Sequence, residues 1–160
     1  MIRHVPMLLL LLSSAAMAAA PAHDSKAPIE INSDHFMADN NSKTGTWWGN
    51  VVIKQGDMLM HADKVRGHVM GNTADKIYAD GHVVVDSPAS GTATGDSGVY
   101  DVPRHMVTLT GHVVLKKQKD VMRGSTLAVN LTTGEAQLDA KGTPSGRVQA
   151  IFTPASAPAK

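Results

Sequence analysis

Short runs along this chain alternate between inward and outward positions with a period of two. Val51 and Ile53 fall on one face of their run, opposite the charged Lys54, and Met58 and Met60 follow in the same alternation. The same pattern gives four further inward positions, at Val107, Leu109, Val113 and Leu115. A period of two is typical of strands with one buried face, and no run keeps a helical period over three turns. We predict an all-β protein.

A block of sequence recurs along the chain. Residues 49–53 (GNVVI), 81–85 (GHVVV) and 111–115 (GHVVL) begin about thirty residues apart. A second element follows each block, at residues 62–65 (ADKV), 95–99 (GDSGV) and 124–127 (GSTL), and residues 136–142 resemble a truncated fourth copy. A repeat of a few short strands cannot bury its apolar face alone, so stacked copies predict a slender solenoid with open ends.

The two ends of such a stack expose strand edges that another protein can pair with. The first predicted strand covers residues 29–32 and the last covers 147–152, and neither carries an internal proline. The edge residues are Ile29, Glu30, Ile31 and Asn32 at one end, and Val148, Gln149, Ala150 and Ile151 at the other. We expect the chain up to about Ala27 to be loose, and residues 153–160 to form a disordered tail.

The N-terminus has the features of a secretory signal peptide. Arg3 and His4 precede an apolar run at residues 7–12, and small residues follow up to Ala20. This pattern predicts a signal peptide at residues 1–20, with cleavage after Ala20 or Ala22, a mature domain at 28–152, and a periplasmic location. An uncleaved N-terminal anchor is the alternative.

The residue composition and the net charge exclude several classes of function. The 160 residues indicate one domain, and 42% of them are hydrophobic although only two Phe, two Tyr and two Trp are present. The interior must therefore be mainly aliphatic, which suits both β-structure and acyl chains. The formal net charge of +1, with both signs interspersed, argues against nucleic-acid binding. The absence of cysteine excludes disulfides and thiol chemistry.

Two motifs suggest chemistry, and both have a simpler explanation. His82 and His112 hold equivalent repeat positions, but no recognisable metal-ligand spacing surrounds them, so we predict no metal and no cofactor. Residues 95–98 (GDSG) resemble a serine-protease nucleophile motif, yet they fall where the repeat places its second element. A turn set by the repeat is the favoured interpretation, and we predict that the protein is not an enzyme.

Three surface features leave alternatives open. The methionines suit either an adaptable lipid-facing lining or an ordinary core. The basic run at residues 116–119 fits a solvated hairpin tip better than a site for lipid phosphates. Trp47 and Trp48 must point in opposite directions, so at most one of them is part of the core.

The order of these motifs resembles the OstA-like family of lipopolysaccharide-transport proteins. The resemblance rests on residues 28–34 (PIEINSD), 49–56 (GNVVIKQG), 62–65 (ADKV) and 107–113 (VTLTGHV), and it extends over residues 28–152. It implies a β-jellyroll made of a twisted, V-shaped pair of sheets. Trp47 and Trp48 depart from the small or β-branched pair that the family prefers.

The resemblance implies that an apolar interior shields the lipid A acyl chains while the sugars face water. It places Ile29, Ile31, Tyr100 and Val102 in contact with lipid, beside the eight inward positions named above. It also implies end-to-end self-association, an LptC-like inner-membrane partner at the N-terminal edge and an LptD-like outer-membrane partner at the C-terminal edge. The rival interpretation is a structural or adhesive β-solenoid without lipid cargo.

Overall fold

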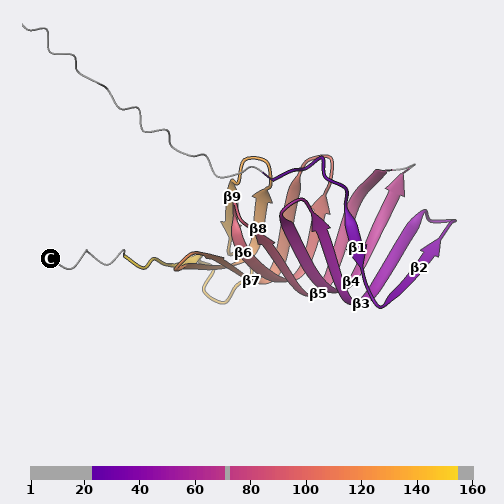
Figure 1. The fold of residues 1–160 in the computed structure, drawn as a ribbon. Coiled ribbons are helices and arrows are strands. Elements are labelled where there is room, and N and C mark those ends of the chain that lie inside the picture. The colour runs from indigo at the N-terminus through magenta and orange to yellow at the C-terminus, as the bar shows by residue number, and fades with distance from the viewer. Residues whose placement is uncertain (1–22, 71–72, 155–160) are drawn as a thin grey trace, which may run out of the picture.

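The computed structural model describes residues 23–70 and 73–154, and every regular element in them is a β-strand (Figure 1). The all-β prediction is confirmed. The proposed signal peptide and residues 155–160 of the tail lie outside the described residues. The strands are β1 (Glu30–Asn32), β2 (His35–Asp39), β3 (Thr44–Gln55), β4 (Met58–Met70), β5 (Thr73–Ser87), β6 (Gly91–Asp101), β7 (Met106–Lys117), β8 (Asp120–Asn130), β9 (Ala136–Asp139) and β10 (Gln149–Ile151).

All ten strands belong to one antiparallel sheet. Its order is β1-β3-β4-β5-β6-β7-β8-β10, with β2 also paired to β3 and β9 also paired to β8. Consecutive long strands are hairpin neighbours, so they lie side by side along one axis, with β2 near one end of the row and β9 near the other (Figure 1). The expected stack along a single axis is confirmed.

The sheet folds into two facing layers because each long strand bends at its middle. The register between neighbouring strands shifts there, for example between Trp48 and Val51 and between Asp80 and Val83. We call this line of bends the corner. The β1-side layer holds β1, β10 and residues 51–62, 83–95 and 113–124. The β2-side layer holds β2, β9 and residues 44–48, 64–70, 73–80, 97–110 and 126–130.

The expected all-β fold with a V shape is confirmed, and its two arms are the two halves of one bent antiparallel sheet. One other sequence-based expectation is corrected. The GDSG motif at residues 95–98 is not a turn: it lies within β6, at the register shift between Thr94 and Ser97. The turn prediction was wrong because glycine and aspartate also occur at bulges, where a strand bends without ending.

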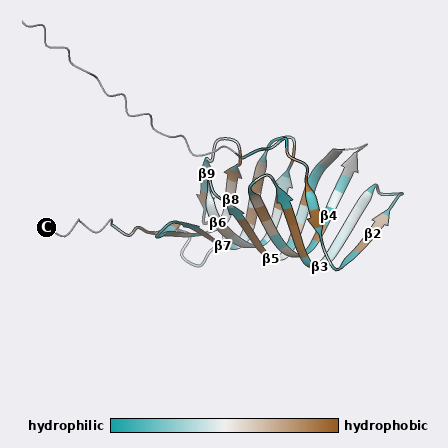
Figure 2. Ribbon diagram, in the orientation of Figure 1, coloured by the Kyte–Doolittle hydropathy of each residue, from teal (hydrophilic) through white to brown (hydrophobic). Residues whose placement is uncertain are grey.

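The core lies between the two layers, and the predicted alternation is confirmed. Met58 and Met60 are 0% and 1% exposed, whereas Leu59 between them is 36% exposed. Figure 2 shows the corresponding alternation of brown and teal bands along the strands. Trp47 is half-buried against the core and Trp48 is exposed, as their opposite directions require.

Candidate functional site

The interior is the first candidate site, and the structure places every predicted lipid-contacting residue in it. Nine of them belong to the buried core: Val51, Ile53, Met58, Met60, Tyr100, Val107, Leu109, Val113 and Leu115. The other three, Ile29, Ile31 and Val102, are partly buried and pack against that core. The alternation thus predicts which side chains point inward, and their contact with lipid stays a prediction.

The layers pack closely against each other. The crevice between Val85, Leu109 and Leu115 has a volume of about 10 Å³, which is about the space of one water molecule. An acyl chain entering here must part the layers and take over contacts that the core side chains now make with one another. The rival structural solenoid also requires a filled interior, so lipid affinity is the property that separates the two readings.

Opposite the corner, hairpin turns of both layers form the rim of the V, which we call the mouth. The Tyr100 hydroxyl, from the β2-side layer, donates a 2.5 Å hydrogen bond to Gln55 Oε1 of the β1-side layer. Both side chains are almost fully buried, and burial raises the pKa of Tyr100 to about 12. This bond joins the two arms across the interior next to the β3–β4 and β6–β7 turns of the mouth.

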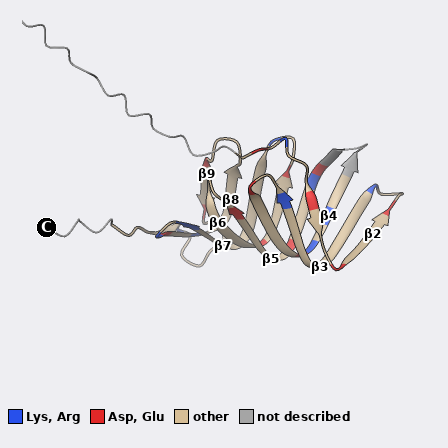
Figure 3. Ribbon diagram, viewed as in Figure 1, with Lys and Arg blue, Asp and Glu red and all other residues tan. Residues whose placement is uncertain are grey.

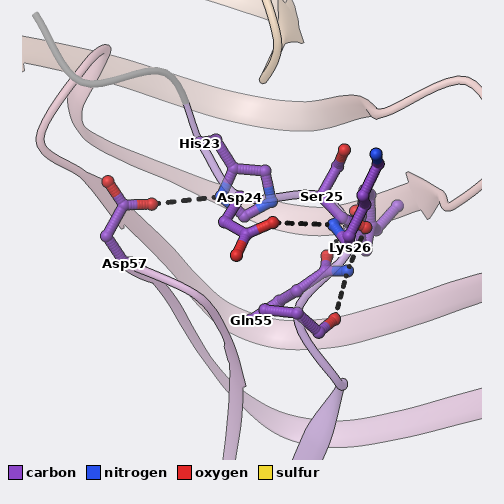
Figure 4. A network of polar contacts seen from close by, with 8 residues as sticks. His23, Asp24, Ser25, Lys26, Gln55 and Asp57 are labelled. Atoms are coloured by element: carbon purple, nitrogen blue, oxygen red, sulfur yellow. Dashed lines mark hydrogen bonds and ion pairs between the residues drawn. The ribbon is translucent and has the colours of Figure 1, made fainter.

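An ordered segment before β1, residues 23–27, also bonds to Gln55; we call it the N-terminal strap. Gln55 Nε2 donates to the carbonyls of Ser25 and Ala27 at 3.1 Å each, and His23 Nδ1 lies 3.1 Å from Asp57 Oδ1 (Figure 4). His23 is only 5% exposed. The expectation that the chain is loose up to Ala27 was therefore wrong for the strap, which bonds to Gln55 of β3 through two backbone carbonyls and to Asp57 of the β3–β4 turn through His23.

The mouth also holds buried polar atoms without partners. Among the described residues these are His23 Nε2, Ser87 Oγ, Ser90 Oγ and His105 Nδ1, and all four come from the strap or from mouth turns. An unpaired buried polar atom costs free energy and calls for water or a ligand group. The mouth therefore offers hydrogen-bonding capacity directly beside an apolar interior.

A row of aspartates lies along the corner, each hydrogen-bonded to an Asn or a His side chain. These pairs were not predicted from the sequence. Asp34 accepts a hydrogen bond from Asn50, Asp63 bonds His82, and each distance is 2.7 Å. Asp96 repeats the arrangement with His112, again at 2.7 Å. The sequence contains a signal for this arrangement, because each of these Asn and His residues directly follows a glycine and lies 16 or 19 residues after its aspartate.

The local backbone explains why glycine precedes each Asn or His. Gly81 and His82 both have positive φ, of 79° and 45°, which bends the strand. A Cβ on Gly81 would lie 2.3 Å from Asp63 Oδ2, so a side chain there would displace the carboxylate. The hydrogen bond to Asp63 and its negative charge raise the pKa of His82 above 6.5, with a smaller contribution from Asp96. Both histidines of the corner, His82 and His112, thus have a carboxylate partner.

The sheet ends are the second candidate site. Ile29 precedes β1, whose residues Glu30, Ile31 and Asn32 pair with β3, and Val148 precedes β10, whose residues Gln149, Ala150 and Ile151 pair with β8. Both predicted edge strands are thus at the edges of the sheet. Each end has a second short strand that completes its edge, β2 beside β3 and β9 beside β8.

The apolar surface continues to the end that carries β1 and β2. Phe36 of β2 faces the same side as Trp47 and the buried Val65, since the three are aligned across the strands. It is nevertheless 57% exposed, and its ring lies 5.0 Å from that of Trp47. No helix of the described residues is long and apolar enough to cross a membrane.

Comparison with known protein families identifies a match over most of the described chain. Residues 30–135 match the model of the family described as LptA/(LptD N-terminal domain) LPS transport protein. The match begins at β1 and ends just before β9, so it includes both layers and the corner.

Individual relatives agree with this match. A protein of Rhizobium meliloti (strain 1021), described as uncharacterized, is 34% identical, with 91% of this chain and 86% of the relative covered. The lipopolysaccharide export system protein LptA of Escherichia coli (strain K12) is 28% identical, with 91% and 84% covered. The crystal structure of LptH, described as the LptA homologue of Pseudomonas aeruginosa, superimposes with a TM-score of 0.74 at 16% identity, covering 82% of this chain and 99% of LptH.

Proposed function

The chain belongs to the LptA/(LptD N-terminal domain) LPS transport protein family, and from this premise we propose that it carries lipopolysaccharide across the periplasm. The acyl chains of lipid A lie between the two layers, and the sugars face water. The single observation that carries the proposal is the aliphatic interior, which extends from β3 to β8 and continues as exposed apolar surface at Phe36. Carrying lipid breaks no covalent bond, so the function needs no nucleophile and no cofactor.

The interior and the mouth together fit an amphiphile with two kinds of surface. Each CH₂ group that moves from water into the interior contributes about 0.8 kcal/mol, so several acyl chains would be held firmly. The unpaired polar atoms of His23, Ser87 and Ser90 lie where the acyl chains would join the sugars. The contact residues of this proposal are the twelve inward positions described above.

The edges of the sheet support assembly by strand pairing. β1 and β10 each pair on one side within the described chain, so their other edges can accept a strand from another protein. We place an LptC-like inner-membrane partner at the β1 end, an LptD-like outer-membrane partner at the β10 end, and further copies of this chain between them. Aligned ends would join the interiors of successive subunits into one apolar path.

Photo-crosslinking tests the lipid path directly. A photoreactive residue is placed at Ile31 or at Val102, both partly buried, and the purified protein is illuminated with purified lipopolysaccharide. We expect an adduct at both positions, because one lies near the end of the sheet and the other at the mouth. Lys54 provides the control, since it neighbours Ile53 but points outward.

The outcome separates the proposal from the structural or adhesive solenoid. Adducts at Ile31 and Val102 but not at Lys54 support an interior lipid path. A folded protein that gives no adduct at either inward position would overturn the proposal and favour the solenoid.

A further inference from the structure

The corner repeats one arrangement three times and then departs from it. Asp34, Asp63 and Asp96 supply a carboxylate to the following Asn or His, each at 2.7 Å. In β8 the repeat element reads GST where β4 has ADK and β6 has GDS, so Ser125 stands at the position of Asp63 and Asp96. The fourth position of the corner therefore lacks its carboxylate.

A surface pocket of about 600 Å³ lies at this fourth position. It is bounded by the corner of β7 and β8 on one side and by the segment between β9 and β10 on the other. Three cationic side chains line it, Arg123, Lys141 and Arg147, together with His112. Figure 3 shows blue Lys and Arg segments at the end of the molecule from which the C-terminal chain emerges.

The positive charge in the pocket is not compensated by the protein. No acidic residue lines the pocket, and within the described chain no carboxylate lies within 4.0 Å of the charged groups of Arg123, Lys141 or Arg147. Asp139 lies close by in sequence, but its carboxylate accepts a hydrogen bond from Gln137 and does not line the pocket. His112 is already bonded to Asp96.

The pocket has a defined shape as well as charge. Thr143 donates from both its amide and its hydroxyl to the carbonyl of Ala140, and Gly146 donates to Thr143, which folds the segment into consecutive turns. The hydroxyl of Ser125 bonds the carbonyl of Asp139 and ties this segment to β8. Thr126 also lines the same space, and its hydroxyl can donate to an oxyanion, whereas the hydroxyls of Ser125 and Thr143 already donate to the carbonyls just named.

We propose that this pocket binds a phosphate group, which takes the place of the carboxylate missing from the fourth position of the corner. Guanidinium groups bind phosphate through paired N–H donors, and the ammonium of Lys141 adds a third charge. The phosphate comes from free phosphate or from a phosphorylated lipid headgroup. The site lies on the outer surface and does not depend on the lipid-carrying function, so a failure of the crosslinking experiment would leave it standing.

Titration of the isotope-labelled full chain, followed by NMR, tests the proposal. The probes are inorganic phosphate and an acyl-free phosphorylated glucosamine disaccharide, each at constant ionic strength, with the unphosphorylated disaccharide as control. We expect saturable shifts confined to amides around Ser125, Gly142 and Thr143 with both phosphorylated probes. Tighter binding of the disaccharide identifies the lipid headgroup as the natural source, and equal binding identifies free phosphate.

A matched pair of variants isolates the missing carboxylate. Ser125→Asp restores the acid of the other positions and should weaken phosphate binding at least about tenfold, whereas the neutral Ser125→Asn should leave it within about threefold. The double variant Arg123→Gln/Arg147→Gln should weaken phosphate binding as Ser125→Asp does. Lys54→Gln, at an exposed position of β3, should leave phosphate binding unchanged. The absence of localised shifts with both phosphorylated probes, or equal affinity of Ser125→Asp and Ser125→Asn, would overturn the proposal.

Discussion

The hydrogen bond between Tyr100 and Gln55 joins the two arms of the sheet at a single pair of buried atoms. In Tyr100→Phe, Gln55 Oε1 stays buried and loses its donor, which costs about 1–3 kcal/mol of the free energy of unfolding. Urea denaturation measures the loss. The ring itself remains, so the change reports on the hydroxyl alone.

Tyr78→Phe is the control for this measurement. Tyr78 is 39% exposed, and its hydroxyl has no hydrogen-bond partner among the described residues. Removal of the Tyr78 hydroxyl should change the free energy of unfolding by less than about 0.5 kcal/mol. Equal effects of the two variants would show that the bond across the mouth contributes nothing to stability.

His82 gives a prediction about pH. Its pKa in the folded protein is raised above 6.5 by Asp63, so the protonated ring stabilises the fold. This stabilisation is complete below the unfolded-state pKa and is lost as the pH rises through the folded-state pKa. An NMR titration of the ring should show the raised pKa, and Asp63→Asn should lower it. A wild-type ring that titrates at or below 6.5 would contradict the pairing seen here.

The bend of each strand depends on a glycine that has no room for a side chain. Gly81→Ala places a Cβ against the Asp63 carboxylate and also forces alanine into a positive φ of 79°. Gly134→Ala is the matched control, because Gly134 has a φ of 71° but no atom within 4 Å of the added Cβ.

Both variants should lose about 1–2 kcal/mol from backbone strain, and Gly81→Ala should lose more because the carboxylate must move away from His82. Chemical denaturation of the two proteins gives the difference. If the losses are the same, the close approach to Asp63 has no energetic importance.

The alternation of apolar and polar residues predicts which face of a strand is buried, because the pleat of a strand is a local property. Val51, Ile53, Met58 and Met60 are all buried, as their spacing indicates. The bends are harder to predict. Gly81 and His82 have the composition of a turn, and only pairing with the neighbouring strands keeps β5 continuous through them. Ser25, Ala27 and Gln55 meet through a contact between segments 28 and 30 residues apart, which no local pattern encodes.

The short strand β10 tests assembly by strand pairing. Ile151 is 52% exposed and lies at the free end of the sheet, so Ile151→Pro removes a backbone donor and fixes φ with little effect on the core. We expect weaker self-association in sedimentation velocity over a range of protein concentrations. Ile151→Val keeps the strand and should associate like the wild type, and an unchanged distribution for Ile151→Pro would exclude β10 from the interface.

Lipid entry between Val85, Leu109 and Leu115 requires the two layers to move apart, because the crevice between these side chains has a volume of only about 10 Å³. Two spin labels, at Lys54 of the β1-side layer and at Arg104 beside the mouth, should move apart by several ångströms when lipopolysaccharide binds. The chain contains no cysteine, so engineered cysteines are labelled selectively.

A second pair of labels, at Lys54 and His61 of the same layer, provides the internal control. Their separation should stay constant, because the hydrogen-bonded ladder holds both strands. If neither pair changes with saturating lipopolysaccharide, lipid does not part the layers.

The corner repeats the same pairing, an aspartate with an Asn or His that follows a glycine, at every second strand. The molecule could therefore be lengthened by adding whole two-strand units. Duplicating one two-strand unit, such as β5 and β6, would insert a bent hairpin whose glycine and aspartate fit their new neighbours, while both terminal edges stayed as they are. Strand twist of about 20–25° per neighbour would then rotate one edge against the other by roughly 40–50°. The number of repeats would thus set the helical pitch of any filament that these subunits build.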